Sequence, residues 1–156
     1  MSTAPVQYFE DLSLTMTDRI ILLDVDGTLA PDGAATFSPA VVEQIRKLKN
    51  NNTVYLCTNT YNQERRRALA SALDVPVLDS PQRKPSRQVV RAFDDHAGKF
   101  LVIGDKFLTD WLFAKNIGAE FIKVKRRISG QERWFIKIIN VVDDVAEAIY
   151  TKIFVR

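Results

Sequence analysis

The stretch Ile20-Ile21-Leu22-Leu23-Asp24-Val25-Asp26-Gly27-Thr28 decides the fold of this chain. Its first four residues form a continuous apolar run of strand length, which is typical of a parallel strand buried on both faces. Two aspartates, a glycine and a threonine follow directly after this run. The stretch therefore predicts a central strand of an α/β domain with acidic side chains at its carboxyl end.

Strand-like and helix-like segments alternate along the rest of the chain. Ser38-Pro39 predicts the start of a helix, because serine caps helices and proline fits the first helical turn. Alternating strands and helices predict a parallel sheet with helices on both faces. Further strands are expected at 53–58, 75–78, 100–103 and 120–124, and helices at 39–49, 62–73, from 85 onward and at 109–116.

We therefore expect a single three-layer α/β domain with a mostly parallel, five-stranded, Rossmann-like sheet. It would span residues 19–156 and end in a helical tail, with one or two helices after residue 131 packed on the sheet. Residues 1–18 show no hydrophobic periodicity and are expected to form a loosely structured N-terminal lead-in.

Composition excludes several classes of protein. A chain of 156 residues, 46% hydrophobic and 26% charged, is typical of one soluble globular domain. The lone Cys57 cannot form an internal disulfide, which favours a cytoplasmic setting. No window approaches the roughly 18 to 20 apolar residues of a membrane-spanning helix, and the acidic N-terminal segment resembles neither a signal nor a transit peptide.

The net charge of +3 is too small to indicate a nucleic-acid partner, and none is expected. The segment Lys123–Lys137, however, holds six basic residues and only one acidic residue, Glu132. Together with Trp134 and Phe135, it suggests peripheral contact with an anionic membrane, because basic and aromatic residues favour that surface. The alternative is that the basic side chains form a solvated face while the two aromatic side chains enter the core.

Polar side chains follow four of the predicted strands. Ligands of open parallel sheets bind beyond the carboxyl ends of the strands, so these side chains are expected to converge at one edge. They are Asp24 and Asp26 after the first strand, Thr58 and Asn59 after the second, Lys84 after the third, and Gly104-Asp105 with Asp110 after the fourth.

These residue types suit phosphoryl transfer. Three close carboxylates repel one another, with each pair at ~4 Å costing about 4 kcal/mol at an effective dielectric constant near 20, so a bound cation is needed. An oxygen-only ligand set favours Mg²⁺ over zinc. Lys84, the Thr58 hydroxyl and the turn amides after Asp24 can hold phosphoryl oxygens.

The ordered motifs Asp24-Val25-Asp26-Gly27-Thr28, Thr58-Asn59, Lys84-Pro85 and Gly104-Asp105-x-x-x-x-Asp110 resemble those of the haloacid dehalogenase superfamily of phosphatases. The resemblance implies that Asp24 is the nucleophile that forms an aspartyl-phosphate, and that Asp26 is the general acid and base.

The same resemblance gives each remaining motif residue a role. Asp24, Asp26 through its main-chain carbonyl, and Asp105 would hold Mg²⁺. The phosphoryl group would bind Thr58, Asn59 and Lys84. Supporting positions are Asp110, Gly104, Gly27 and Thr28.

The connections between the motifs are too short for the cap domain that many superfamily members carry. Strands and helices of the domain itself are expected to take up most of both connections, Leu29 to Leu56 and Thr60 to Arg83. An uncapped site can admit a bulky phosphomonoester, or a second subunit in a homo-oligomer can close it.

Within the capless group, the segment Gly104–Asp110 and the basic stretch behind it resemble the phosphatidylglycerophosphate (PGP) phosphatases. Gly27 and Ile117 depart from that subgroup's usual Asn and Arg. The resemblance favours a phosphatidylglycerophosphate-like lipid headgroup as substrate. A sugar phosphate, nucleotide or phosphoprotein is the alternative, as is a catalytically inactive scaffold of the same fold.

Overall fold

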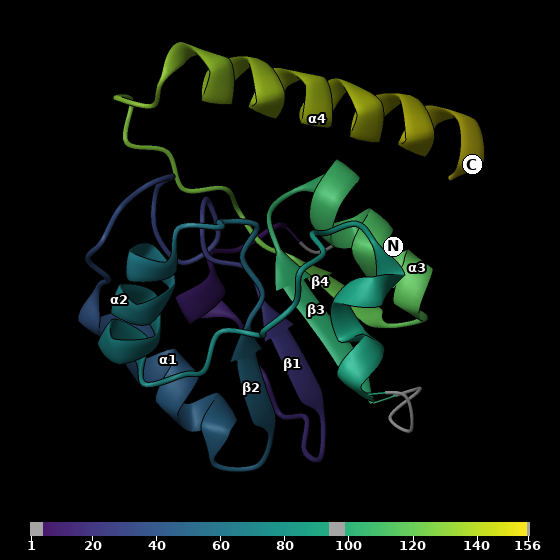
Figure 1. Ribbon diagram of the computed structural model, residues 1–156. Helices are drawn as coiled ribbons and strands as arrows, with labels where there is room; N and C mark the ends of the chain where they lie inside the picture. Colours follow the sequence, from purple (N-terminus) through teal and green to yellow (C-terminus); the bar gives the residue numbers. More distant parts are fainter. Residues whose placement is uncertain (1–4, 94–98, 156) are drawn as a thin grey trace.

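The computed structural model describes residues 5–93 and 99–155, which form an α/β domain around a parallel sheet in the order β2-β1-β3-β4 (Figure 1). The central strand β1 lies between β2 and β3, and Leu23 pairs with Leu56 on one side and Ile103 on the other. The carboxyl ends of the three strands are therefore level. The strands are β1 (Ile20–Leu23), β2 (Thr53–Leu56), β3 (Phe100–Gly104) and β4 (Glu120–Lys123).

The α/β class is confirmed, but the prediction of five strands is wrong, because the sheet formed by residues 5–93 and 99–155 has four. The segment 75–78 runs beside β2 and forms only an isolated bridge between Val77 and Leu56. Pro76 accepts a hydrogen bond from the Leu56 amide but has no N–H of its own to donate. The segment thus cannot continue a ladder.

Helices cover both faces of the sheet. The helix α1 begins after Ser38, whose hydroxyl accepts a hydrogen bond from the Val41 amide, and α2 begins after Asn62, which caps the Arg65 amide in the same way. The helical elements are η1 (Phe9–Asp11), α1 (Pro39–Lys49), α2 (Gln63–Leu73), η2 (Arg87–Phe93), η3 (Phe107–Trp111), α3 (Leu112–Ile117) and α4 (Trp134–Phe154).

The core has two layers, one on each face of the sheet, because alternate residues of a strand point to opposite faces. Ile21 and Leu23 of β1 pack with Ile45 of α1 and Leu69 of α2. Ile20 and Leu22 pack on the other face with residues of β3 and α3, including Phe113. This arrangement is the three-layer architecture that the alternation of strands and helices predicts.

From residue 5 onward, the N-terminal segment is irregular apart from η1 and is attached to the domain at several points. Phe9 in η1 is fully buried in the core layer of α1, and the Gln44 side chain of α1 donates a hydrogen bond to the Leu12 carbonyl at 2.7 Å. The Lys125 amide donates to the Gln7 carbonyl, also at 2.7 Å. A buried aromatic side chain and hydrogen bonds to α1 and to Lys125 therefore hold a segment that has no periodic pattern.

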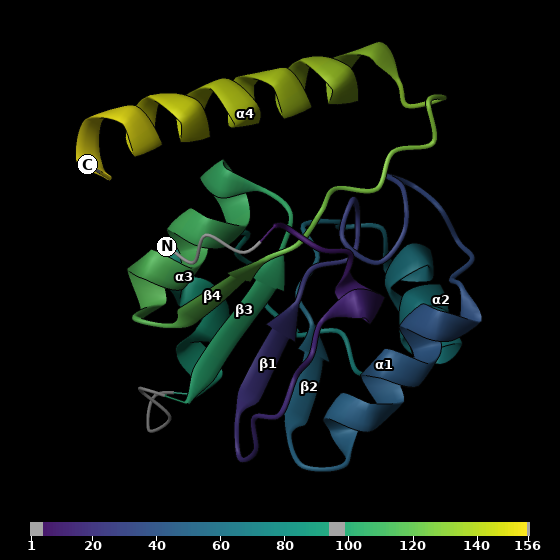
Figure 2. The same cartoon turned by 180° about the vertical axis from the view of Figure 1, so that it is seen from behind.

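The C-terminal segment forms one helix, α4, which does not pack flat on the sheet. It lies above the carboxyl ends of the strands in both views of the molecule and contacts η3 (Figures 1 and 2). Within the described residues, no helix is long and apolar enough to cross a membrane.

The connections that follow β1 and β2 hold only elements of the domain itself. Residues 29–56 form a loop, α1 and β2, and residues 60–83 form α2 and a loop. In this part of the chain, all of which is described, neither connection carries a cap.

The buried aromatic of the N-terminal segment gives a first prediction. Phe9→Ala should lower the free energy of unfolding by about 3 to 5 kcal/mol, because it removes a fully buried ring and leaves a cavity. Urea unfolding followed by circular dichroism measures the change. Val6→Ala, at a half-exposed position of the same segment, is the control and should change stability by less than about 0.5 kcal/mol. Equal effects of the two substitutions would mean that the segment does not support the core.

Candidate active site

Asp24 lies at the carboxyl end of the central strand, where its amide still donates to the Ile103 carbonyl at 2.9 Å. Its carboxylate is buried, as is that of Asp105 after β3. The Thr28 hydroxyl lies 2.9 Å from Asp24 Oδ2 and 3.0 Å from Asp105 Oδ1. Because a hydroxyl has one proton, it can donate to only one of the two carboxylates at a time. Thr28 thus links the first and fourth motifs.

Two glycines allow the loops that carry these aspartates to approach each other. Gly27 has φ +88°, and a Cβ atom on it would lie 2.8 Å from Asp105 Oδ2. A Cβ atom on Gly104 would overlap the carboxylate of Asp110. Both positions therefore require glycine for conformation or for space.

Lys84 is the buried cation of the site. Its ammonium group lies 2.6 Å from Asp24 Oδ1 and 2.5 Å from Asp110 Oδ1, and all three side chains are buried. Burial favours the neutral amine, but the charges of Asp110 and Asp24 outweigh it and raise the pKa of Lys84 well above its ordinary value. The third motif is thus joined to the first and fourth.

The two carboxylates beside Lys84 differ in pKa. Burial alone would raise the pKa of Asp24, but the charges of Lys84 and Lys106 hold it below the ordinary value. Burial, together with repulsion from Asp24, raises the pKa of Asp110 to about 6, although Lys84 partly opposes this. Asp24 is therefore the carboxylate that stays ionised.

Thr58 and Asn59 lie at the end of β2 and line a cavity of about 350 Å³ with Asp24, Asp26 and Lys84. The Asn59 side chain makes reciprocal hydrogen bonds with the Lys84 backbone: its Oδ1 accepts at 2.9 Å and its Nδ2 donates at 3.2 Å. Asn59 therefore positions Lys84, whereas the predicted direct contact with phosphate stays a prediction.

Three basic side chains complete the site, and sequence reasoning missed all of them. Lys106 donates to the Asp26 carbonyl at 3.0 Å and lies 3.4 Å from Asp105 Oδ1. Arg126 Nε donates to Asp105 Oδ2 at 2.7 Å, and Arg65 Nη2 donates to Asp26 Oδ1 at 2.5 Å. Only Lys106 carried a signal, because it directly follows Asp105 in the fourth motif. Arg65 and Arg126 lie in segments that only the tertiary fold brings here.

The carboxylates form a group that fits a hard divalent cation. Asp24, Asp105 and Asp110 each offer an oxygen within 4.8 Å of the other two. Burial raises the pKa of Asp105, and so does the charge of Asp24, while Lys106 and Arg126 oppose the rise. The Lys106 ammonium lies against two of the oxygens predicted as metal ligands, the Asp26 carbonyl and an Asp105 carboxylate. All the donor atoms here are oxygens, and they already attract the Lys106 ammonium group. Such a set of ligands suits Mg²⁺.

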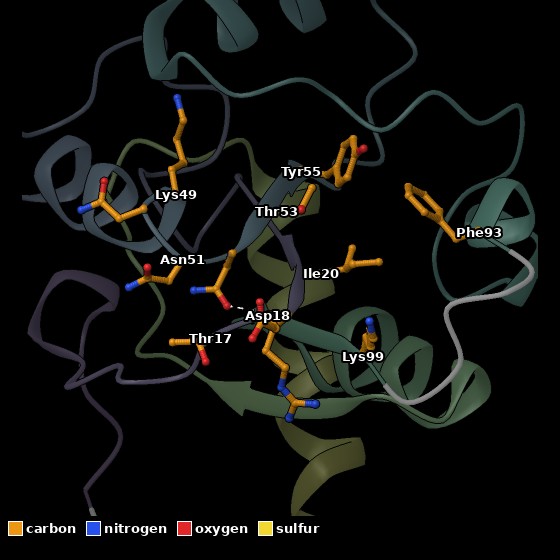
Figure 3. Close-up of a pocket in the computed structure, with 12 residues that line it drawn as sticks. Thr17, Asp18, Ile20, Lys49, Asn51, Thr53, Tyr55, Phe93 and Lys99 are labelled. Atoms are coloured by element: carbon orange, nitrogen blue, oxygen red, sulfur yellow. Dashed lines mark hydrogen bonds between the residues drawn. The ribbon is translucent and has the colours of Figure 1, made fainter.

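A larger hollow of about 800 Å³ lies at the opposite end of the sheet, beside Asp18, Thr53 and Lys99 (Figure 3). Two of its charged side chains pair with neighbouring elements, Arg19 with Glu120 and Lys49 with Asp74. Ligands of parallel sheets bind at the carboxyl ends of the strands, so the smaller cavity is the candidate active site.

The fold and this constellation resemble those of α/β phosphatases of the haloacid dehalogenase type, and residues 29–56 and 60–83 hold no cap. The model of a family described as mitochondrial PGP phosphatase matches residues 4–129, and the chain belongs to this family. Membership implies a phosphatase, a hydrolase of phosphoric monoesters. None of the curated proteins matches the chain. The family description names mitochondria, which does not fit the predicted cytoplasmic setting exactly. The cytoplasmic setting therefore stays a prediction.

The buried ion cluster predicts that Lys84→Met lowers the free energy of unfolding near pH 7 by about 3 to 5 kcal/mol, because two buried carboxylates lose their cation. Urea unfolding measures the change. Lys47→Met, at an exposed position of α1, is the matched control and should have little effect.

The loss of unfolding free energy in Lys84→Met, called its deficit below, should depend on pH. The pKa of Asp110 is raised in the folded protein, so its contribution to stability is complete below about pH 4 and is lost as the pH rises through about 6. Without Lys84 this folded-state pKa rises further. The deficit should therefore be smaller near pH 4 than near pH 7, and a deficit that is independent of pH would contradict the buried charge cluster.

Proposed function

We propose that this chain is a Mg²⁺-dependent phosphomonoester hydrolase that acts through an aspartyl-phosphate on Asp24. The observation that carries the proposal is the position of Asp24 at the carboxyl end of β1, where it lines the cavity and contacts Lys84 and Thr28. The family match supports a phosphatase.

Asp24 is suited to attack phosphorus. The Lys84 and Lys106 charges keep its pKa low, so the carboxylate is ionised near neutral pH. One of its oxygens forms a bond to phosphorus while the bond from phosphorus to the ester oxygen breaks. Lys84, which also lines the cavity, balances the charge that gathers there.

Asp26 is suited to move protons. Both of its fixed contacts, from the Gly33 amide at 3.0 Å and from Arg65 at 2.5 Å, fall on Oδ1, which leaves Oδ2 to exchange a proton. Asp26 gives a proton to the leaving ester oxygen and then takes one from the water that attacks phosphorus. Inorganic phosphate leaves, and Asp24 returns as a free carboxylate.

The residues that would hold Mg²⁺ are Asp24, Asp105 and the main-chain carbonyl of Asp26. When bound, the ion neutralises charge on the phosphoryl oxygens and favours nucleophilic attack. Asp110 keeps Lys84 in place beside these ligands. It also closes the loop after β3, because its Oδ2 accepts from the Lys106 amide and its own amide donates to the Lys106 carbonyl, both at 3.1 Å.

The proposed substrate is a phosphatidylglycerophosphate-like lipid headgroup. Its support is the family description together with the absence of a cap in residues 29–56 and 60–83, so that no inserted domain in these connections covers the cavity. A panel that also holds a sugar phosphate, a nucleotide and a phosphopeptide separates this substrate from the alternatives.

The mechanism is tested by phosphate release from that panel. Release should require Mg²⁺ and fall to background in Asp24→Asn, because an amide cannot form the acyl-phosphate. Asp26→Asn should lower kcat about 10²- to 10⁴-fold through loss of proton transfer. Asp79→Asn, at a fully exposed side chain, is the control and should retain full activity. Turnover in Asp24→Asn would disprove the covalent mechanism, and no turnover of any compound by the wild type would revive the inactive scaffold.

Lys106 makes a separate prediction about the metal. Because its ammonium group occupies part of the acidic site, Lys106→Gln should bind Mg²⁺ about tenfold more tightly and gain more thermal stability from it. Titration calorimetry and thermal unfolding with and without Mg²⁺ measure both effects. Lys125→Gln, at an exposed lysine, should match the wild type. Weaker Mg²⁺ binding in Lys106→Gln would show that this lysine supports the metal site instead of competing with it.

A further inference from the structure

The helix α4 exposes a continuous apolar surface on the side that faces away from the domain. Its residues recur at helical spacing, and each is between 51% and 73% exposed. We call this surface the outer face of α4. It consists of Trp134, Ile138, Val141, Val142, Val145, Ile149 and Ile153.

The opposite side of α4 contacts the domain. Rotation of the helix that buried the outer face would break these contacts. Asp143 is buried and accepts hydrogen bonds from the amides of Phe107 at 2.9 Å and Leu108 at 2.7 Å. Glu147 pairs with Lys123 of β4. Tyr150 packs against Phe107, with ring centroids 5.3 Å apart.

We infer that the outer face of α4 docks the protein onto an anionic membrane surface, with the helix lying in the plane of the interface. Amphipathic helices bind there by burying an apolar face at the boundary between headgroups and acyl chains. Trp134 and Phe154, 73% and 70% exposed near the two ends of α4, are of the aromatic type that favours this boundary. The inference rests on the proposed function for its purpose, because a lipid substrate lies in a membrane.

The docking surface shares only Trp134 and the flanking Lys137 with the basic stretch Lys123–Lys137 that the sequence suggests. Lys123 pairs with Glu147, and Arg127 with Glu10. Arg126 contacts Asp105, Asp143 and Asp144. Half of the six basic side chains in Lys123–Lys137 are thus used to hold the domain together. The proposed contact with the membrane is therefore made by α4 and not by these three side chains.

The charges around the outer face favour a membrane over a second copy of this chain. Lys137 and Lys152 are exposed near its two ends, whereas Asp143 and Glu147 are turned to the domain and the exposed Asp144 is neutralised by Arg126. In an antiparallel pair of α4 helices, Lys137 of one copy would lie beside Lys152 of the other, and in a parallel pair each lysine would meet its equivalent. Both pairings bring like charges together, while anionic lipids attract these lysines.

The same helix reaches the candidate active site. Ile136 and Ile139 line its cavity together with Asp26 and Lys84. A protein docked through the outer face of α4 thus holds this cavity next to the membrane surface, where a phosphorylated headgroup is available.

Sedimentation with vesicles tests the inference. The wild type should bind vesicles of phosphatidylcholine mixed with phosphatidylglycerol, and bind less at high salt or to phosphatidylcholine alone. Val145→Glu should weaken vesicle binding about tenfold or more, because it places a charge in the outer face of α4, which binding would bury in the membrane. Val42→Glu is the matched control: it makes the same substitution at an exposed valine of α1 and should bind like the wild type.

Several outcomes would overturn the inference. They are no binding of the wild type to anionic vesicles, equal binding by Val145→Glu and Val42→Glu, or a dimer in solution that Val145→Glu dissociates without changing vesicle binding. Hydrolysis of a water-soluble aryl phosphate separates the two proposals, since Val145→Glu should leave it unchanged. Vesicle binding without hydrolysis would reject the proposed function alone, and hydrolysis without vesicle binding would reject the docking surface alone.

Discussion

The ion pairs of the buried Lys84 ammonium with Asp24 and Asp110 are the interaction on which the rest of the site depends. Two carboxylates this close, away from water, would repel each other by several kcal/mol without a cation between them. Lys84 removes that repulsion and at the same time ties together three segments that are far apart in the sequence. Asn59 fixes the backbone of Lys84, so the end of β2 is joined to the same cluster. The level ends of the parallel strands make this convergence geometrically simple.

A second cation, Arg126, connects the acidic residues of the site to α4. Arg126 contacts Asp105 in the site and Asp143 and Asp144 on α4, and Asp143 also holds the amides at the start of η3. Arg126 therefore neutralises Asp105 and at the same time helps to hold α4 in position. A helix with little contact to the sheet can stay in one place because its acidic residues are anchored in this way.

The local patterns of the sequence predict most of the fold and the motif residues of the site. The apolar run of β1 and the polar residues after each strand suffice, since parallel strands of one register must bring their ends together. The pattern fails where a local rule competes with it, as at 75–78, where Pro76 prevents a ladder. It also misses Phe9, Arg65 and Arg126, whose roles depend on partners that are distant in the sequence.

The orientation of α4 is a further case in which periodicity is insufficient. The helix is apolar on more than one side, with Ile136 and Ile139 at the cavity and Ile138 and Val145 on the outer face. Hydrophobicity alone therefore does not choose the side that faces the domain. The choice is made by Asp143 and Glu147, because a buried or paired carboxylate must meet its donors, and these lie at η3, β4 and Arg126. The apolar side left outward is thus a consequence of the contacts that hold Asp143 and Glu147 to the domain, and one of these partners, Arg126, also neutralises Asp105 in the candidate active site. These charges therefore account for an exposed hydrophobic helix beside the cavity.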